Sequence, residues 1–101
     1  MSGVRELNSA QDFDAIIANN RIALIFYGSA KCGHCKSITP FVAELVTRYP
    51  SVAFGHVEVT KVKVEGIDGV PVFVVYKDQK PVDKLVGADQ EGLVKLLRQN
   101  M

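Results

Sequence analysis

The sequence predicts an α/β domain in which helices cover both faces of a central mixed sheet of about five strands. The segment Ile22–Tyr27 is continuously apolar and rich in strand formers, which indicates a central strand buried on both faces. Segments with strand character alternate with segments of helical periodicity, and this alternation is typical of a sheet covered on both sides. The length of 101 residues suits one domain with one core, so we expect a single domain over residues 1–101.

The first half of the chain is expected to form two strands and two helices. Val4–Leu7 has the pattern of a short edge strand, and Ser9 followed by Asp12 is typical of a helix start. Three apolar residues then fall on one helical face: Phe13, Ile16 and Ile17. After the strand Ile22–Tyr27, apolar residues recur at three- and four-residue intervals, which predicts a second, amphipathic helix. Pro40 lies inside this second helix and is expected to kink it.

The second half is expected to add three strands and a last helix. Val52–Val59 is a strand candidate, and Thr60–Gly66 is a short connection with room for one helical turn. Val72–Tyr76 and Pro81–Val86 are separated by a polar turn, which predicts a β-hairpin. Asp89 is placed to cap the final helix. The inner face of that helix carries Leu93, Leu96 and Leu97.

Composition and charge exclude several classes of function. The formal net charge is +1 with interspersed signs, so the chain has no electrostatic footprint for nucleic acid or for an anionic membrane. No apolar run approaches the roughly 20 residues of a membrane span. Charged residues interrupt Met1–Asn20, which is unlike a signal peptide. Small secreted domains usually carry several disulfides, and this chain has two cysteines. We therefore expect a monomeric protein of the cytoplasm or another reducing compartment, unless the chain is a processed mature form.

The only two cysteines lie in one CGHC motif, Cys32–Cys35, between an apolar strand and a helix. A helix start leaves backbone N–H groups unpaired and carries partial positive charge, and both effects favour a thiolate over a thiol. The thiolate is the species that attacks disulfides. Two thiols this close can also oxidise to a disulfide within one loop. The motif therefore predicts a redox-active dithiol that exchanges two electrons without a cofactor.

Two other interpretations of the cysteines are weaker. Ordinary buried thiols would not explain why both cysteines fall in one CxxC motif at a strand–helix junction. A structural zinc ion needs four ligands, and one CxxC supplies two. His34 lies between the cysteines and cannot easily join the same ion, and His56 is the only other histidine. We therefore expect no metal in the monomer, although a metal shared across a dimer and an iron–sulfur cluster remain alternatives.

With these residues in view, the chain resembles the thioredoxin family over nearly its whole length. The matching segments are Ile22–Tyr27, Cys32–Lys36, Pro40, Gly69–Pro71 and Val86–Gly87. The resemblance implies the thioredoxin fold and a thiol–disulfide oxidoreductase that reduces disulfides of protein substrates. It also implies a reductase or a low-molecular-weight thiol as the electron donor.

The resemblance assigns a role to each residue of the site. Cys32 is expected to be the exposed, attacking thiol, and Cys35 the more buried thiol that resolves the mixed disulfide. Pro71 is expected to follow a cis peptide bond and to face the cysteines, unless it is an ordinary loop proline. The backbone of Val70 is expected to pair with substrate, and Gly87 to keep the substrate groove shallow.

Four residues are expected to tune the redox potential of the pair: Lys31, Gly33, His34 and Lys36. Thioredoxins normally carry proline at the position of His34, whereas CGHC is typical of protein disulfide isomerases. A protonated histidine there would stabilise the thiolate and make the pair more oxidising. Disulfide isomerase or oxidase activity is therefore an alternative function. A thioredoxin-like interaction module with little redox turnover is another.

The chain departs from the family pattern around the motif. The family's two tryptophans correspond to Gly28 and Lys31, and the chain has no tryptophan at all. The buried acid that many thioredoxins carry six residues before the first cysteine is Phe26 here. Another group must then deprotonate Cys35, and His56 on the neighbouring strand is a candidate. The connection after that strand is also several residues shorter than usual, so we expect one family helix to be reduced to a turn.

Overall fold

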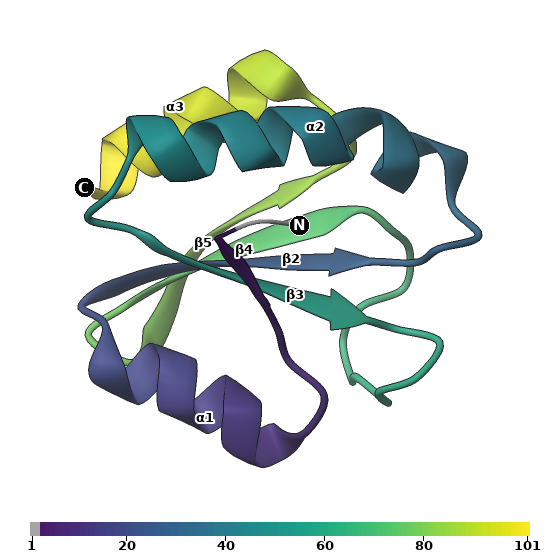
Figure 1. Ribbon diagram of the computed structural model, residues 1–101, viewed down its shortest axis with the longest axis horizontal. Helices are drawn as coiled ribbons and strands as arrows, with labels where there is room; N and C mark the ends of the chain where they lie inside the picture. The colour runs from purple at the N-terminus through teal and green to yellow at the C-terminus, as the bar shows by residue number, and fades with distance from the viewer. Residues whose placement is uncertain (1–2) are drawn as a thin grey trace.

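The computed structural model describes residues 3–101 as a five-stranded sheet with helices on both faces (Figure 1). The elements in chain order are β1 (Val4–Glu6), α1 (Ala10–Asn19), β2 (Ile22–Gly28), α2 (Gly33–Arg48), β3 (Ala53–Glu58), β4 (Val72–Lys77), β5 (Lys80–Val86) and α3 (Gln90–Asn100). The strands lie in the order β1-β3-β2-β4-β5. Pairings among β1, β3 and β2 are parallel, and those of β4 with β2 and β5 are antiparallel. The predicted mixed sheet is confirmed.

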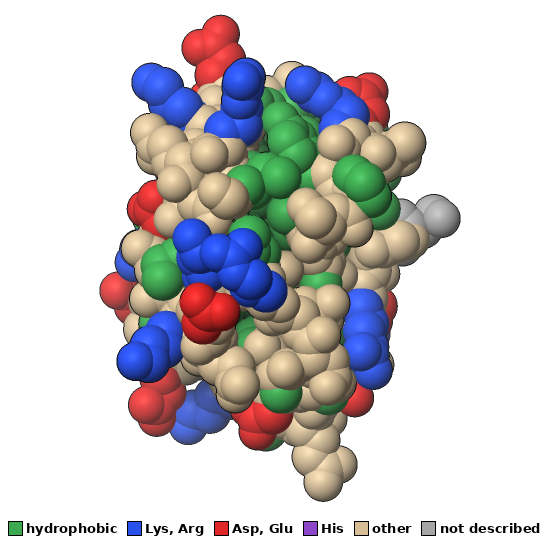
Figure 2. Space-filling view, turned by 90° about the vertical axis from the view of Figure 1, so that its left-hand side faces the viewer, with side chains coloured by type: hydrophobic (Ala, Val, Ile, Leu, Met, Phe, Trp, Pro, Cys, Tyr) green, Lys and Arg blue, Asp and Glu red, His purple; other side chains and the backbone are tan. Residues whose placement is uncertain are grey.

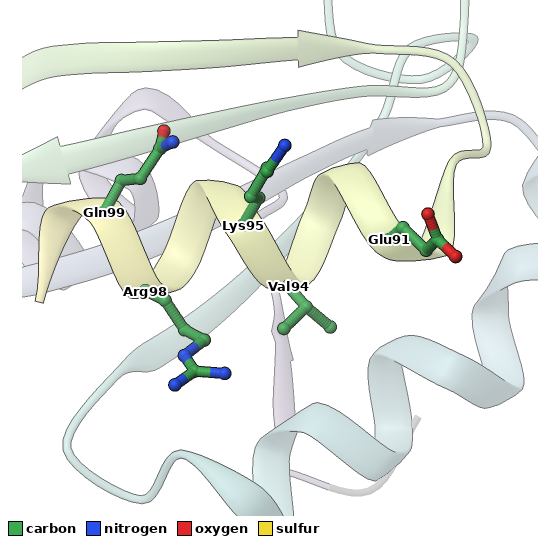
Figure 3. A pocket seen from close by; sticks show the side chains of 5 residues that line it. All are labelled: Glu91, Val94, Lys95, Arg98 and Gln99. Carbon is green, nitrogen blue, oxygen red and sulfur yellow. The ribbon is translucent and has the colours of Figure 1, made fainter.

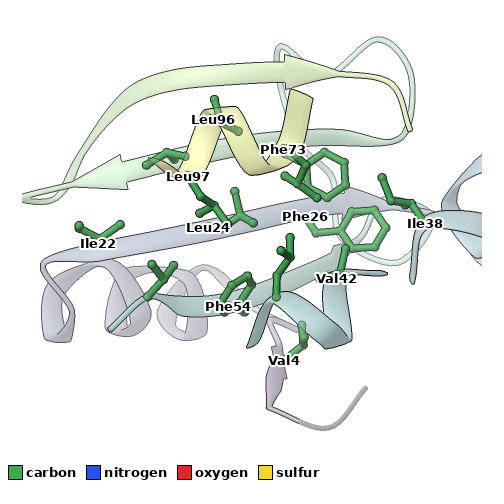
Figure 4. Packing of buried hydrophobic residues seen from close by; sticks show 14 of the residues in the cluster. Val4, Ile22, Leu24, Phe26, Ile38, Val42, Phe54, Phe73, Leu96 and Leu97 are labelled. Carbon is green, nitrogen blue, oxygen red and sulfur yellow. The ribbon is translucent and has the colours of Figure 1, made fainter. Parts of the chain in front are cut away.

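The central strand β2 is buried along its whole length, as its continuous apolar run predicted. One face packs against α2 and α3, and the other packs against α1 (Figures 1 and 4). Phe26 is 2% exposed and stacks on Phe73, with ring centroids 4.8 Å apart. The position that carries a buried acid in many thioredoxins is therefore occupied by an aromatic core residue.

Each of the three helices begins at a side-chain cap. Ser9 Oγ accepts the Asp12 N–H at 3.1 Å, and the Asp89 carboxylate accepts the Gly92 N–H at 3.0 Å. Both caps were predicted from local sequence, because these residue types satisfy the free N–H groups of a helix start. α2 instead begins at Cys32 and continues as one helix through Pro40 to Arg48. The cap of α2 thus belongs to the redox motif.

The connection between β3 and β4 contains the single turn that the sequence predicted. The N–H groups of Lys61 and Val62 both donate to the carbonyl of Glu58 and form a single turn, and no helix follows in residues 60–66. Partly buried side chains of this connection pack against the α1 side of the sheet: Val62, Val64 and Ile67. The chain therefore covers this part of the sheet with apolar side chains from a loop.

The predicted hairpin joins β4 to β5. Asp78 and Gln79 both have positive φ, at 52° and 70°, and Lys77 pairs with Lys80 on either side of them. A two-residue turn with positive φ at both positions matches the right-handed twist of the flanking strands. The hairpin sets the register of β4, whose first residue, Val72, follows Pro71 directly. Among residues 3–101, none of the helices combines the length and the apolarity that crossing a membrane requires.

Candidate active site

Cys32 is the N-cap of α2, directly after the loop that leaves β2. Its Sγ accepts the Cys35 N–H at 3.1 Å, and its own N–H donates to the Ser29 carbonyl at 3.1 Å. The side chain is partly exposed. A backbone N–H donor and the N-terminal end of a helix dipole both attract negative charge, and both lie at this sulfur. The geometry therefore suits Cys32 for attack on an incoming disulfide.

Cys35 lies one turn further along α2, and its environment is the opposite of that of the partly exposed Cys32. The residue is 3% exposed. Burial raises the pKa of the Cys35 thiol to about 11, and a hydrogen bond with the Cys32 side chain acts in the same direction. A backbone hydrogen bond at Ser29 opposes these effects only in part. Cys35 is therefore held as a neutral thiol until a step of the reaction requires its thiolate.

The loop before β4 lies against the motif. The Val70–Pro71 peptide bond is cis, as the family resemblance implied, and Cys32 Sγ donates to the Val70 carbonyl at 3.8 Å. The Pro71 carbonyl accepts the Gly87 N–H at 2.9 Å. Gly87 has a φ of +104°, a backbone conformation that favours glycine. The structure thus brings together Cys32, Val70, Pro71 and Gly87, which are distant in sequence.

The four expected tuning residues all lie at the surface beside the sulfurs. Lys31, Gly33, His34 and Lys36 are exposed. A Cβ added to Gly33 would meet no atom within 4 Å, so the surface next to Cys32 is open. Open space beside Cys32 leaves room for another molecule to approach its sulfur.

A recess of about 150 Å³ lies behind Cys35 on the inner side of the motif. Its lining combines residues from the core, the active-site loop, α2 and β3: Phe26, Ser29, Ala30, Cys35, Lys36, Thr39, His56 and Glu58. His56, the candidate base from the sequence, lines this recess together with Cys35, and its role stays a prediction. The ring of His56 packs against Phe26 with centroids 5.1 Å apart.

Glu58 is a member of this group that the sequence did not indicate. One carboxylate oxygen accepts the Ala30 N–H at 2.7 Å, and the other accepts the Thr60 hydroxyl at 2.7 Å and the Thr60 N–H at 3.2 Å. The hydrogen bond from the Thr60 side chain is the main reason that the pKa of Glu58 is lowered. Its position two residues after His56, on the same face of β3, was the available signal. Glu58 thereby anchors the loop that carries the motif.

A second unanticipated partner is Glu6 on β1. His56 pairs with Glu6 in the parallel register of β1 and β3, and Glu6 Oε1 lies 2.7 Å from His56 Nδ1. The His56 side chain is 15% exposed and that of Glu6 is 50% exposed. The imidazole is therefore held from the side that faces away from β2.

Elsewhere on the surface of residues 3–101, the recesses are not lined by a cysteine. A larger recess of about 470 Å³ follows α3 and is lined by one helix alone: Glu91, Val94, Lys95, Arg98 and Gln99 (Figure 3). Within residues 3–101, no three His, Cys, Asp or Glu side chains are grouped so that they could hold a metal ion. Figure 2 shows Lys and Arg side chains mixed with Asp and Glu over another face of the molecule. The reactive side chains are therefore found at the Cys32–Cys35 dithiol.

A CxxC dithiol at a helix start, opposite a cis-proline loop on a mixed sheet of this order, defines a thiol–disulfide oxidoreductase of the thioredoxin fold. A family model described as "Thioredoxin" matches residues 4–99. The chain belongs to the thioredoxin family, and it is a thiol–disulfide oxidoreductase.

The individual relatives agree with the family model. The chain is similar to thioredoxin 1 of Plasmodium falciparum, with 35% identity over 93% of this chain and 94% of the relative. It is also similar to a thioredoxin of Chlamydia caviae, with 31% identity over 91% and 94% of the two chains. A solved structure of Plasmodium falciparum thioredoxin superimposes with a TM-score of 0.92 at 33% identity, covering 97% of this chain and all of the other. These matches favour neither the isomerase nor the interaction-module alternative.

Proposed function

We propose that the protein reduces disulfides of other proteins, with Cys32 as the nucleophile and Cys35 as the resolving thiol. The observation that carries this assignment is the contrast between the two sulfurs. Cys32 is partly exposed and accepts a backbone N–H, whereas Cys35 is buried and its pKa is raised. An attacking thiol must reach its substrate as a thiolate, while a resolving thiol must be withheld from solvent.

The proposed reaction proceeds in two exchanges. The Cys32 thiolate attacks one sulfur of the substrate disulfide, which forms a mixed disulfide and releases the other substrate sulfur as a thiolate. Cys35, as a thiolate, then attacks Cys32 Sγ, so that the bond from Cys32 to the substrate breaks and the Cys32–Cys35 disulfide forms. The substrate gains two electrons and two protons, and the protein is left oxidised. A reductase or a low-molecular-weight thiol restores the dithiol.

The substrate is proposed to bind over the surface formed by Val70, Pro71 and Gly87. Pro71 has no N–H and cannot compete for backbone contacts with the substrate. Beside Gly87, the side chain of Val86 is 67% exposed and extends this surface with an apolar residue. An extended segment next to a substrate cysteine would thus find both backbone and apolar contacts close to Cys32.

A reducing compartment such as the cytoplasm is the proposed location, and a monomer is the proposed working state. A dithiol with one partly exposed sulfur stays reduced only where a thiol donor is at hand. Fractionation of cells that express the chain at natural levels tests the location. A sedimentation profile of the purified protein tests the oligomeric state.

The function is tested by insulin reduction with dithiothreitol as the electron source. The wild-type protein is expected to accelerate precipitation of the insulin B chain, and Cys32→Ser is expected to abolish the acceleration. The exposed Glu44→Gln on α2 is the matched control and is expected to behave as wild type. A wild-type protein that fails to accelerate the reaction, although it is folded and reduced, would refute the proposal.

A further inference from the structure

The resolving thiol needs a base that the core does not supply. Burial raises the pKa of Cys35 to about 11, so at neutral pH nearly all of this group is thiol. Only its thiolate can attack the mixed disulfide. The residue packed beneath this site on β2 is Phe26, which has no acid–base function. The proton of Cys35 must therefore leave through the recess behind it.

Three titratable groups line that recess together with Cys35: Lys36, His56 and Glu58. Lysine in its charged form has no acceptor for a proton. Both oxygens of Glu58 already accept hydrogen bonds, and its pKa is lowered, so it is a weak base towards a thiol. Imidazole is the side chain whose ordinary titration lies near neutral pH, which suits it for proton transfer under these conditions.

The ring of His56 is oriented so that it can accept a proton from the direction of Cys35. Its Nδ1 lies 2.7 Å from Glu6 Oε1, and a carboxylate at that distance keeps the ring proton on Nδ1. Nε2 is then left with a free lone pair. It lies 3.4 Å from the place that a Cβ on Gly28 would take, so it points towards the end of β2 that continues into the active-site loop. Gly28 has no side chain to close this space.

The surroundings of the ring differ in the groups that each neighbouring element contributes. β2 contributes Phe26 and Gly28 to the contacts of the ring, and neither residue titrates. The charged or titratable groups that face it are Glu6 from β1, Glu58 from β3, and Cys35 and Lys36 from α2. The recess of about 150 Å³ exceeds the roughly 30 Å³ that one water molecule occupies in the liquid, so water fits between the thiol and the imidazole.

The geometry points to His56 as the general base for the resolving step, with Glu6 as the residue that positions it. The inference deepens the proposed function and rests on it. The proton on Cys35 Sγ passes through water to His56 Nε2 while Cys35 attacks Cys32 Sγ. The imidazolium formed is stabilised by the Glu6 carboxylate on Nδ1. The substrate leaves as a thiolate, and His56 returns the proton to it or to solvent.

The test isolates the second exchange with Ellman's reagent, a small aromatic disulfide. Attack by Cys32 on the reagent releases one thionitrobenzoate, and attack by Cys35 on the resulting mixed disulfide releases another. Both releases are followed by absorbance in a stopped-flow instrument between pH 5 and pH 9. In the wild-type protein we expect the rate of the second release to rise with pH and then to level off, as catalysis by a general base requires.

The His56→Gln variant removes the base and keeps a polar side chain. We expect the second release to slow at least about 10-fold at pH 7, with the first release changed less than about 2-fold. The levelling-off of the rate with pH should disappear, and added free imidazole should restore part of the rate. Glu6→Gln should slow the second release less and shift its pH profile. Glu58→Gln tests the neighbouring carboxylate of the same recess and should slow the second release less than His56→Gln does. The exposed Glu44→Gln on α2, outside the recess, is the matched control and should leave both releases unchanged.

The outcomes separate this inference from the proposed function. A wild-type protein without a first release would refute the nucleophile assignment itself. A normal first release with an unchanged second release and pH profile in a folded His56→Gln variant would overturn the base assignment alone. Loss of the second release in Glu58→Gln, with His56→Gln retaining it, would transfer the role to Glu58. Circular dichroism of each variant confirms that the sheet and helices are intact.

Discussion

The two sulfurs of the CGHC motif are one helical turn apart, and they face opposite environments. On the outer side, Cys32 meets Val70 and an open surface, with a backbone N–H directed at its sulfur. On the inner side, Cys35 is buried beside a recess that contains His56 and Glu58. The outer side leaves its sulfur accessible at a helix start, whereas the inner side buries its sulfur and raises its pKa. Identical side chains thus stand in different environments because of their position alone, and the proposed division of roles rests on this difference.

After loss of the outer sulfur, which abolishes activity, the largest expected effect comes from removing the inner sulfur. Cys35→Ser keeps the nucleophile and its exposure but leaves no group to resolve the mixed disulfide. We expect turnover of insulin to fall by about a thousandfold or more, because release would then depend on an external thiol. The mixed disulfide should accumulate, and intact mass spectrometry should detect protein plus one substrate chain. If Cys35→Ser reduced insulin as fast as the wild-type protein does, the proposed difference in role between the two sulfurs would be wrong.

The raised pKa of Cys35 also predicts how stability depends on pH. The folded protein holds the proton of this thiol more tightly than the unfolded chain, because the pKa rises from about 9 to about 11. The folded state therefore binds more protons between these values, and the free energy of unfolding should decrease as pH rises from about 9 to about 11. Urea titrations of the reduced protein at pH 8, 9, 10 and 11 measure this decrease.

The control for that measurement is Cys35→Ser, which has no thiol to titrate. Tyr27 is also buried, and its pKa is raised too, so it adds its own decrease at alkaline pH in both proteins. Only the difference between wild type and Cys35→Ser reports on Cys35. Parallel curves for the two proteins from pH 9 to pH 11 would show that burial does not raise the pKa of this thiol.

The smallest expected effect concerns His34 on the outer side. A protonated histidine beside Cys32 stabilises the thiolate and hence the reduced pair, which makes the motif more oxidising. His34→Pro should therefore lower the redox potential of the Cys32–Cys35 pair by about 10–30 mV, because roughly 30 mV corresponds to 1.4 kcal/mol for two electrons. Equilibration with glutathione buffers measures it. An equal or higher potential in His34→Pro would show that His34 has no such influence.

The central strand, two of the helix starts and the hairpin could be predicted from the sequence, because each depends on residues that are close together in the chain. The continuous apolar run made β2 central, and Ser9 and Asp89 marked helix starts through their side-chain oxygens. The polar turn between β4 and β5 likewise predicted the hairpin. The connection after β3 also forms the one turn expected of it, and no helix follows in residues 60–66. Its apolar residues pack singly against the sheet, which a periodicity in the sequence could not predict.

The inner half of the site could not be predicted in full, because it depends on strand register. Glu6 and His56 are 50 residues apart in sequence, and only the parallel pairing of β1 with β3 places them side by side. Glu58 reaches Ala30 across 28 residues in the same way. The outer half was predictable because Cys32 and Cys35 carry a local motif, and because Pro71 and Gly87 match family positions.

Competitive alkylation of the reduced wild-type protein tests the contrast between the two sulfurs most directly. Limiting iodoacetamide is added at pH 7, and peptide mass spectrometry measures the labelling of each cysteine. We expect Cys32 to be labelled at least about 100-fold faster than Cys35, because Cys32 is exposed at a helix start and Cys35 is buried with a pKa of about 11. Equal labelling, or faster labelling of Cys35, would contradict the division of roles.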